Sequence, residues 1–141
     1  PLLDRFLAVR ERSDRYPCSL AAGALAELLH EGHLATHLRR ARKRAQQSRD
    51  ALCTGLAGSP LDVRVPDQGL HLVADLPPWL DETTAQRYAL QAGLATRALS
   101  SFHLGGTARK GLVIGFSGFA PVAFGAAAAA TRRLLLTIAP P

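Results

Sequence analysis

The hydrophobic pattern of the first part of the chain is helical. Apolar residues recur at spacings of three, four and seven along 33–56, which predicts a long amphipathic helix with a basic opposite face. Two shorter helices are predicted before it, over 1–12 and 19–31. Gly32 follows the second of them and is its predicted C-terminal residue.

Short apolar runs separated by turn residues replace this pattern after the long helix. Two candidate strands, 61–65 and 69–76, are joined by Pro66-Asp67-Gln68 and should pair as a hairpin. Asp81 is the predicted N-cap of a helix that ends near Ala92. The chain therefore changes from helices to alternating strands and helices.

Two more strands and a closing helix complete the predicted order. The strands span 94–99 and 112–116, with a polar loop over 100–110 between them, and the last helix spans 119–138. This order favours an α+β fold: a small, mostly antiparallel sheet of about four strands, packed by helices and preceded by the long helix. No internal repeat or long linker occurs, so we expect one domain over 1–141.

Composition and charge describe an ordinary globular chain. Its 141 residues are 48% hydrophobic and 20% charged, which excludes a fibrous or wholly disordered protein. The formal net charge of +6 is compatible with an anionic partner, but solubility explains such a charge equally well. Charge alone therefore identifies no partner.

Cysteine usage and the longest apolar run bear on location. Cys18, at the start of one predicted helix, and Cys53, within another, are expected to be buried free thiols, which indicates a reducing compartment. The first thirty residues show no secretory pattern, so a cytoplasmic location is expected. The apolar run 119–130 is shorter than the roughly 20 residues of a membrane-spanning helix, so no membrane partner is predicted.

The residues by themselves reveal no complete catalytic motif. His33 and His37 have a spacing that could place both on one metal ion, but no third ligand is recognisable, which favours exposed or capping histidines. The basic run Arg39 to Arg44 could contact phosphates, although a solvated helix face is the favoured interpretation. Ser100 lies close to His103, but no acid partner is implied.

Several short motifs occur in a fixed order along nearly the whole chain. A stretch containing Gly-His and then His-Leu-Arg-Arg begins at Glu31, and Arg-Asp-Ala-Leu follows at 49–52. Gly-Leu-His begins at Gly69, a glycine and later Leu-Ser lie in 93–100, and the strand 111–116 is the last. In this order they resemble the small C-terminal domain of fold type I pyridoxal-phosphate enzymes. The resemblance is strongest to the aminotransferase-like domain of MocR/GabR-type transcriptional regulators of the GntR family.

This resemblance implies a parent protein with properties that the chain does not carry alone. The parent would use pyridoxal 5'-phosphate, form a homodimer and sense an amino-acid or pyridoxal-phosphate-type effector. It would bind DNA only through an N-terminal domain that is absent here. The chain would be a fragment that also lacks the cofactor-binding large domain. Neither Lys43 nor Lys110 stands in the family's Ser-Lys context, so this chain alone is expected to bind no cofactor covalently and to be no enzyme.

The resemblance also places a wall of the effector cleft at the last strand and the loop before it. Related aminotransferases hold the substrate carboxylate there with an arginine, and the corresponding position is Val113. The predicted wall residues are Ser100, Phe102, His103, Arg109 and Val113.

Three functions remain open. The first is a fragment of an aminotransferase-like regulator, and the alternative is the C-terminal domain of a true class I/II aminotransferase that transfers an amino group between an amino acid and a 2-oxo acid. The third is a free-standing basic nucleic-acid-binding module. A winged-helix segment upstream of Pro1 would favour the regulator.

Overall fold

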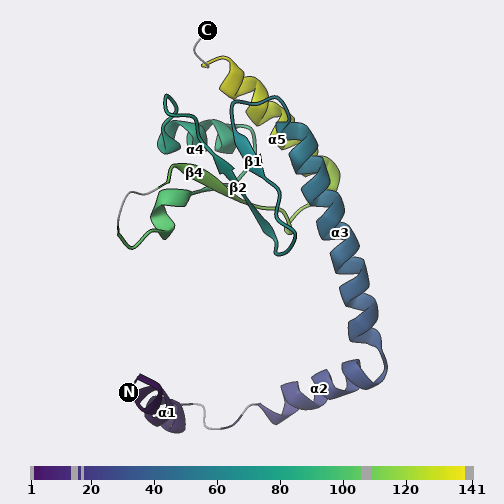
Figure 1. Ribbon diagram of the computed structural model, residues 1–141. Coiled ribbons are helices and arrows are strands. Elements are labelled where there is room, and N and C mark those ends of the chain that lie inside the picture. The colour runs from purple at the N-terminus through teal and green to yellow at the C-terminus, as the bar shows by residue number, and fades with distance from the viewer. Residues whose placement is uncertain (1, 14–15, 17, 106–108, 139–141) are drawn as a thin grey trace. The chain divides into compact units, whose positions relative to one another are not determined.

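The chain divides into two compact units, Pro1–Ala41 and Arg42–Pro141, which are described separately (Figure 1). Helix α3 (His33–Leu56) contributes its first residues to one unit and the remainder to the other. The computed structural model describes residues 2–13, 16, 18–105 and 109–138.

The first unit consists of helices with little burial. It contains α1 (Leu2–Ser13), α2 (Ser19–His30) and the start of α3, and none of the described residues of α1 or α2 is buried. Gly32 has a φ of 73°, in the left-handed region that glycine adopts without strain, and the chain turns there between α2 and α3. The three helices predicted from the sequence are thus confirmed, although position 1 lies outside the described residues.

The second unit contains a four-stranded antiparallel sheet in the order β1-β2-β4-β3. The hairpin of β1 (Asp62–Arg64) and β2 (His71–Asp75) forms as predicted, and β4 (Gly111–Gly115) pairs with β2 along its whole length. Strand β3 (Arg97–Ala98) lies at the edge beside β4. This arrangement confirms the predicted α+β fold.

The third predicted strand was too long. Leu94 instead lies in the turn that follows the preceding helix, which ends at Gln91, and its backbone N–H donates to Ala89 O at 2.8 Å. After the two residues of β3, the chain turns into a short 3₁₀ helix, η1 (Leu99–Phe102). The predicted loop after it includes 106–108, which lie outside the described residues.

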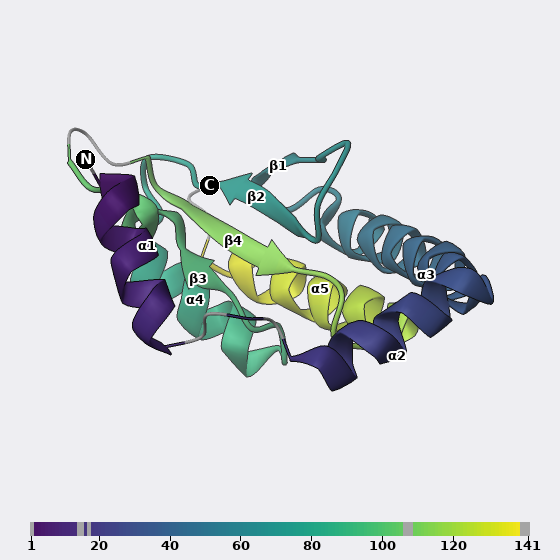
Figure 2. The same cartoon turned by 90° about the horizontal axis from the view of Figure 1, so that it is seen from below.

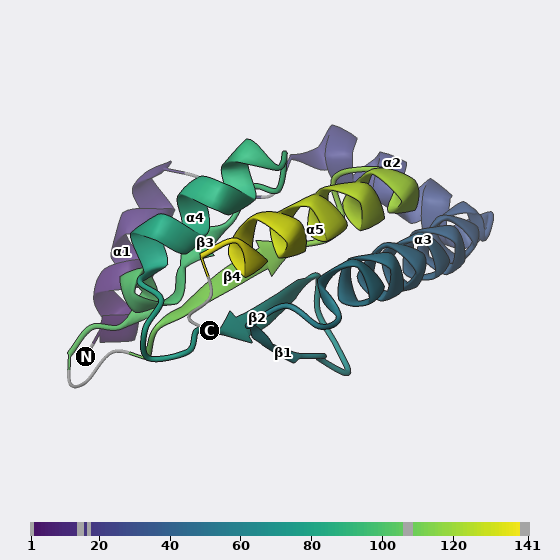
Figure 3. The same ribbon diagram turned by 90° about the horizontal axis from the view of Figure 1, so that it is seen from above.

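Helices α4 (Glu82–Gln91) and α5 (Pro121–Leu136) cover one face of the sheet together with the C-terminal part of α3 (Figure 3). Asp81 caps α4 as predicted, because its Oδ1 accepts a hydrogen bond from Thr84 N at 3.1 Å. The core between the helices and the sheet is built from alternate strand residues and one side of each helix. Its members include Leu52, Leu56, Leu72, Ala74, Ala85, Ala89, Leu112, Ile114, Ala128 and Leu135.

The two cysteines correct one expectation. Both are free thiols, but Cys18 is exposed and Cys53 is only half-buried. Cys18 lies just before α2, in the unit where neither short helix buries a described residue, so no core is present among those residues to enclose it. Burial raises the pKa of the Cys53 thiol, and the nearby Arg49 opposes that rise. Within the described residues, no helix is both long enough and apolar enough to cross a membrane.

Candidate ligand cavity on the open face of the sheet

The face of the sheet that points away from α4 and α5 carries the candidate site (Figure 2). Side chains alternate between the two faces of a strand, so Val113 lies opposite to the buried Leu112 and Ile114. Backbone pairing aligns one row across this face, in the order Arg64, Val73, Val113 and Arg97. The row therefore has a guanidinium at each edge of the sheet and two valines between them.

A cavity of about 550 Å³ lies on this face at the β4 and β3 side. His71 stands opposite Gly115 in the pairing of β2 with β4. A Cβ built on Gly115 would lie 3.4 Å from His71 Cδ2, so the imidazole occupies the space that the glycine leaves open. The residues that line the cavity are His71, Ala95, Thr96, Arg97, Phe102, Val113 and Gly115.

The cation of this cavity is Arg97. Its Cζ lies 4.7 Å from the centroid of the Phe102 ring, a cation–π contact that holds the guanidinium over the aromatic face. Within the described part of the chain, Arg97 forms neither a salt bridge nor a hydrogen bond through its side chain. Its N–H groups are therefore available to an anion in the cavity.

Two other arginines near this face are already paired with a carboxylate that they share. Asp75 is half-buried and accepts from Arg64 Nε at 2.7 Å, while both of its oxygens lie 2.6 Å from Arg109 Nη2. Arg109, which we predicted as a wall residue, is thus engaged with β2 and does not line the cavity. Arg97 is distinct from both because it has no carboxylate partner among the described residues.

Two further predicted wall residues are engaged in local contacts. Both oxygens of the Glu82 carboxylate bind Ser100: Oε2 accepts from its hydroxyl and Oε1 from its backbone N–H at 3.1 Å. His103 is exposed, and its Nδ1 lies 3.2 Å from Leu99 O. Of the five predicted residues, Phe102 and Val113 line the cavity.

Sequence reasoning missed His71 and Arg97, which line the same cavity as Phe102 and Val113. His71 belongs to the Gly-Leu-His motif, which indicated a strand but no site. Arg97 lay inside a predicted strand, but its position opposite Val113 depends on a pairing between segments separated by a loop. That pairing was the missing signal.

Glu82 joins the loop that precedes β4 to the start of α4. Besides Ser100, its Oε1 accepts the backbone N–H of Gly111 at 2.8 Å. Burial raises the pKa of this carboxyl, but the hydrogen bonds from Ser100 and Gly111 outweigh burial and lower the pKa below its ordinary value. The ionised carboxylate therefore stabilises the position of η1 and of Phe102 at its end.

Substituting Glu82→Gln should lower the free energy of unfolding by about 1 kcal/mol at neutral pH, since partial solvent exposure weakens these charge-assisted bonds. Because the folded-state pKa is depressed, the contribution of Glu82 is complete above its unfolded pKa of about 4.3 and is lost as pH falls through the folded value. Urea unfolding of both proteins from pH 7 to pH 3 measures this difference. Glu27→Gln, at an exposed position of α2, is the control. A difference between wild type and Glu82→Gln that grows with acidity would contradict the assignment.

The lysines do not fit covalent attachment of pyridoxal phosphate in this cavity. A Schiff base needs a lysine amine at the cofactor, and the chain has only Lys43 and Lys110. Lys43 is exposed on α3, Lys110 precedes β4, and neither lines the cavity.

The histidines of the first unit form no recognisable metal centre. His33 Nε2 lies 2.9 Å from Glu31 Oε2, and both side chains are largely exposed. The described residues contain no group of three or more His, Cys, Asp or Glu side chains that could hold a metal ion.

A curated sequence relative is the probable rhizopine catabolism regulatory protein MocR of Rhizobium meliloti. It is 32% identical over 123 residues, which are 85% of this chain but only 25% of the relative. The chain thus spans a quarter of the length of that protein. No protein-family model matches the chain.

Solved structures with the same fold are aminotransferases. The alpha-aminoadipate aminotransferase LysN of Thermus thermophilus, complexed with N-(5'-phosphopyridoxyl)-L-leucine, matches 96% of this chain with 36% of its own, at a TM-score of 0.79 and 19% identity. The kynurenine aminotransferase of Pyrococcus horikoshii matches 78% of this chain with 28% of its own, at a TM-score of 0.66 and 18% identity. In fold the chain is an aminotransferase-like small domain, and in sequence it is MocR-like.

Proposed function

We propose that this chain is the small domain of the effector-binding and dimerisation module in a pyridoxal-phosphate-dependent, aminotransferase-like transcriptional regulator. The observation that carries the proposal is the open sheet face of a MocR-like chain. There a cavity presents Arg97, a guanidinium without a carboxylate partner among the described residues, beside the apolar Val113. Such a face binds and positions a small anion. No lysine among the described residues lines the cavity, so a cofactor lysine would have to come from outside this face.

The remainder of the module would lie in a longer polypeptide, which would fold a cofactor-binding large domain and an N-terminal DNA-binding domain. The low coverage of the relatives supports this proposal, because the chain matches 25% of the regulator and 36% of LysN. In this proposal residues 1–141 are one structural part of that protein. The protein binds DNA only through its N-terminal domain, forms a homodimer and works in the cytoplasm.

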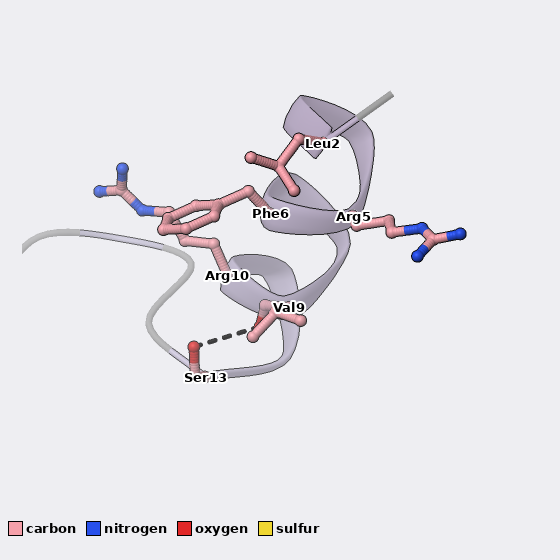
Figure 4. A pocket seen from close by; sticks show the side chains of 6 residues that line it. All are labelled: Leu2, Arg5, Phe6, Val9, Arg10 and Ser13. Carbon is pink, nitrogen blue, oxygen red and sulfur yellow. Dashed lines mark hydrogen bonds between the residues drawn. The ribbon is translucent and has the colours of Figure 1, made fainter. Parts of the chain in front are cut away.

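Apolar side chains on α1 support a docking role for the first unit. Leu2, Phe6 and Val9 lie along α1 and line a cavity of about 450 Å³ together with Arg5, Arg10 and Ser13 (Figure 4). Phe6 is 73% exposed and Leu2 is 83% exposed, which is costly for side chains of this size in water. The proposed occupant of this surface is the large domain of the same protein.

The regulator is favoured over the enzyme by the sequence relative, because the chain is 32% identical to the regulator MocR over 123 residues. By the resemblance, the arginine that holds the substrate carboxylate in aminotransferases would stand at the position of Val113, and Arg109 is held by Asp75 instead of lining the cavity. The alternative, a true class I/II aminotransferase, rests on the likeness to LysN, whose 19% identity shows the fold alone.

The full-length protein, as its gene encodes it, distinguishes the two functions. After loading with pyridoxal phosphate, we expect amino acids to change its affinity for DNA from its own promoter region, without repeated amino transfer to 2-oxo acids. Gel-shift titration and a coupled assay for the new amino acid measure the two outcomes. Sustained turnover in a protein without DNA affinity would establish the enzyme instead.

A further inference from the structure

We propose that the cavity on the open face binds a carboxylate with an apolar body, and that Arg97 is the residue that binds the carboxylate. The inference rests on the proposed function and names the chemical class of its effector. A guanidinium presents two parallel N–H groups that match the two oxygens of a carboxylate. The contact of Arg97 with Phe102 leaves the edge of the guanidinium free for such a fork.

The comparison of three arginines assigns the carboxylate to Arg97. Arg64 and Arg109 share the carboxylate of Asp75, so a ligand would have to compete with a bound anion for either of them. Arg97 has no such competitor in the described part of the chain and lines the cavity directly. A ligand carboxylate would complete for Arg97 the pairing that Asp75 provides for the other two.

The surroundings of Arg97 identify the rest of the ligand as apolar. Val113, which is paired with Arg97 across the strands, lies on the same face and contributes its side chain to the cavity lining. A second cavity of about 310 Å³ shares Ala95 and Gly115 with the first. Its other lining residues are mostly small or aromatic: Gly93, Leu94, Ser117, Gly118, Phe119, Ala123, Phe124 and Ala127. An apolar body that starts at Val113 can therefore extend past Gly115 toward Phe119.

Two polar groups at the cavity can bind a further polar atom of the ligand. His71 lies beside Gly115 at the side of β2. The hydroxyl Oγ1 of Thr96 is buried and has no hydrogen-bond partner among the described residues. Buried hydroxyl groups are nearly always paired, so a small shift of the Thr96 side chain toward the cavity would let a polar group of the ligand satisfy this one. These groups suit an amino or hydroxyl substituent near the carboxylate.

Binding of 4-methylpentanoate and of its neutral amide to the full-length protein tests the inference. The two probes share the branched apolar body and differ only in charge. By isothermal titration calorimetry we expect the acid to bind about tenfold to a hundredfold more tightly than the amide, as for a hydrogen-bonded charge pair. Arg97→Gln should abolish this preference. Arg87→Gln should retain it, because Arg87 also stacks on a tyrosine, Tyr88, with its Cζ 5.5 Å from the ring centroid, but does not line the cavity.

A second variant tests where the apolar body of the ligand lies. Ala123 is exposed at the second cavity, and Ala123→Leu should fill part of that space. We expect it to weaken 4-methylpentanoate at least severalfold while acetate binding stays unchanged. Unchanged affinity for 4-methylpentanoate would overturn the apolar placement. Circular dichroism shows whether each variant remains folded, and Arg97→Lys repeats the charge test with the positive charge kept but the fork removed.

The outcomes separate this inference from the proposed function. Equal binding of acid and amide, or an undiminished preference in Arg97→Gln, overturns the role of Arg97. If amino acids still change DNA affinity in that case, the proposed regulator stands and its effector is bound elsewhere. If wild type shows the acid preference but no amino acid changes DNA affinity, the carboxylate site stands and the regulator fails.

Discussion

Replacing Gly55 by alanine is expected to lower the free energy of unfolding by about 1–3 kcal/mol, the usual cost of overpacking a tightly packed interior. Gly55 lies in α3 where α5 approaches it. A Cβ at this position would lie 2.6 Å from Ala128 Cβ and 2.8 Å from Gly125 O. The second contact is with backbone, so the two helices would have to separate. Urea unfolding of the purified protein measures the change.

Gly125→Ala provides the matched control from the facing helix. A Cβ on Gly125 would lie 3.6 Å from Ala51 Cβ, which is an ordinary van der Waals contact. Alanine in a helix interior is favoured over glycine by roughly 0.5–1 kcal/mol, so this variant should be neutral or more stable. If both substitutions changed stability equally, the close crossing of α3 and α5 at Gly55 would be wrong.

Truncation of Ile114 to alanine is expected to cost about 2–5 kcal/mol of stability, because the side chain is fully buried beneath the helices. Ile114 belongs to β4, which is bonded on both sides by β2 and β3. Loss of its side chain leaves a cavity in the core shared by the sheet and the helices. The midpoint of urea unfolding should shift in proportion.

Val113→Ala is the control for Ile114, one residue away on the opposite face. Val113 is only half-buried and lines the ligand cavity, so its truncation should cost less than about 1 kcal/mol. The pair of variants tests which face of β4 belongs to the core. A larger loss at Val113 than at Ile114 would reverse the two faces and remove the basis for the cavity.

Local chemistry made most of the fold predictable. The left-handed turn at Gly32 and the cap by Asp81 act over a few residues, and both occur where the sequence places them. The third strand was predicted too long at both ends, because Leu94 is bonded to the end of α4 and because η1 follows at Leu99, where Glu82 of that helix binds Ser100. No pattern within that segment records such contacts.

The candidate site was less predictable than the fold. Val113 could be placed by resemblance and Phe102 by its nearness to Leu-Ser, but whether a loop side chain faces the cavity depends on tertiary partners. Arg109 is an example, because its ion pair with Asp75 depends on Asp75 lying at the end of β2. Arg97 was not predicted as a site residue, because it lies in a segment that was interpreted only as a strand. Its pairing with Val113 places it at the cavity.

The open face connects these observations to function. The helices cover one face of the sheet and bury Ile114, while the other face retains Arg97 over Phe102 beside Val113. This division attaches the candidate cavity to the core through the same strands. We therefore expect the open face to complete a cleft whose cofactor and DNA-binding parts come from the remainder of the polypeptide.

A crystal structure of the full-length protein with pyridoxal phosphate bound tests this account most directly. The predicted result places Arg97 and Val113 at the wall of a cleft that also contains the cofactor, held by a lysine from outside this chain. A structure in which the open face is covered by another helix, or faces solvent away from any cofactor, would contradict it.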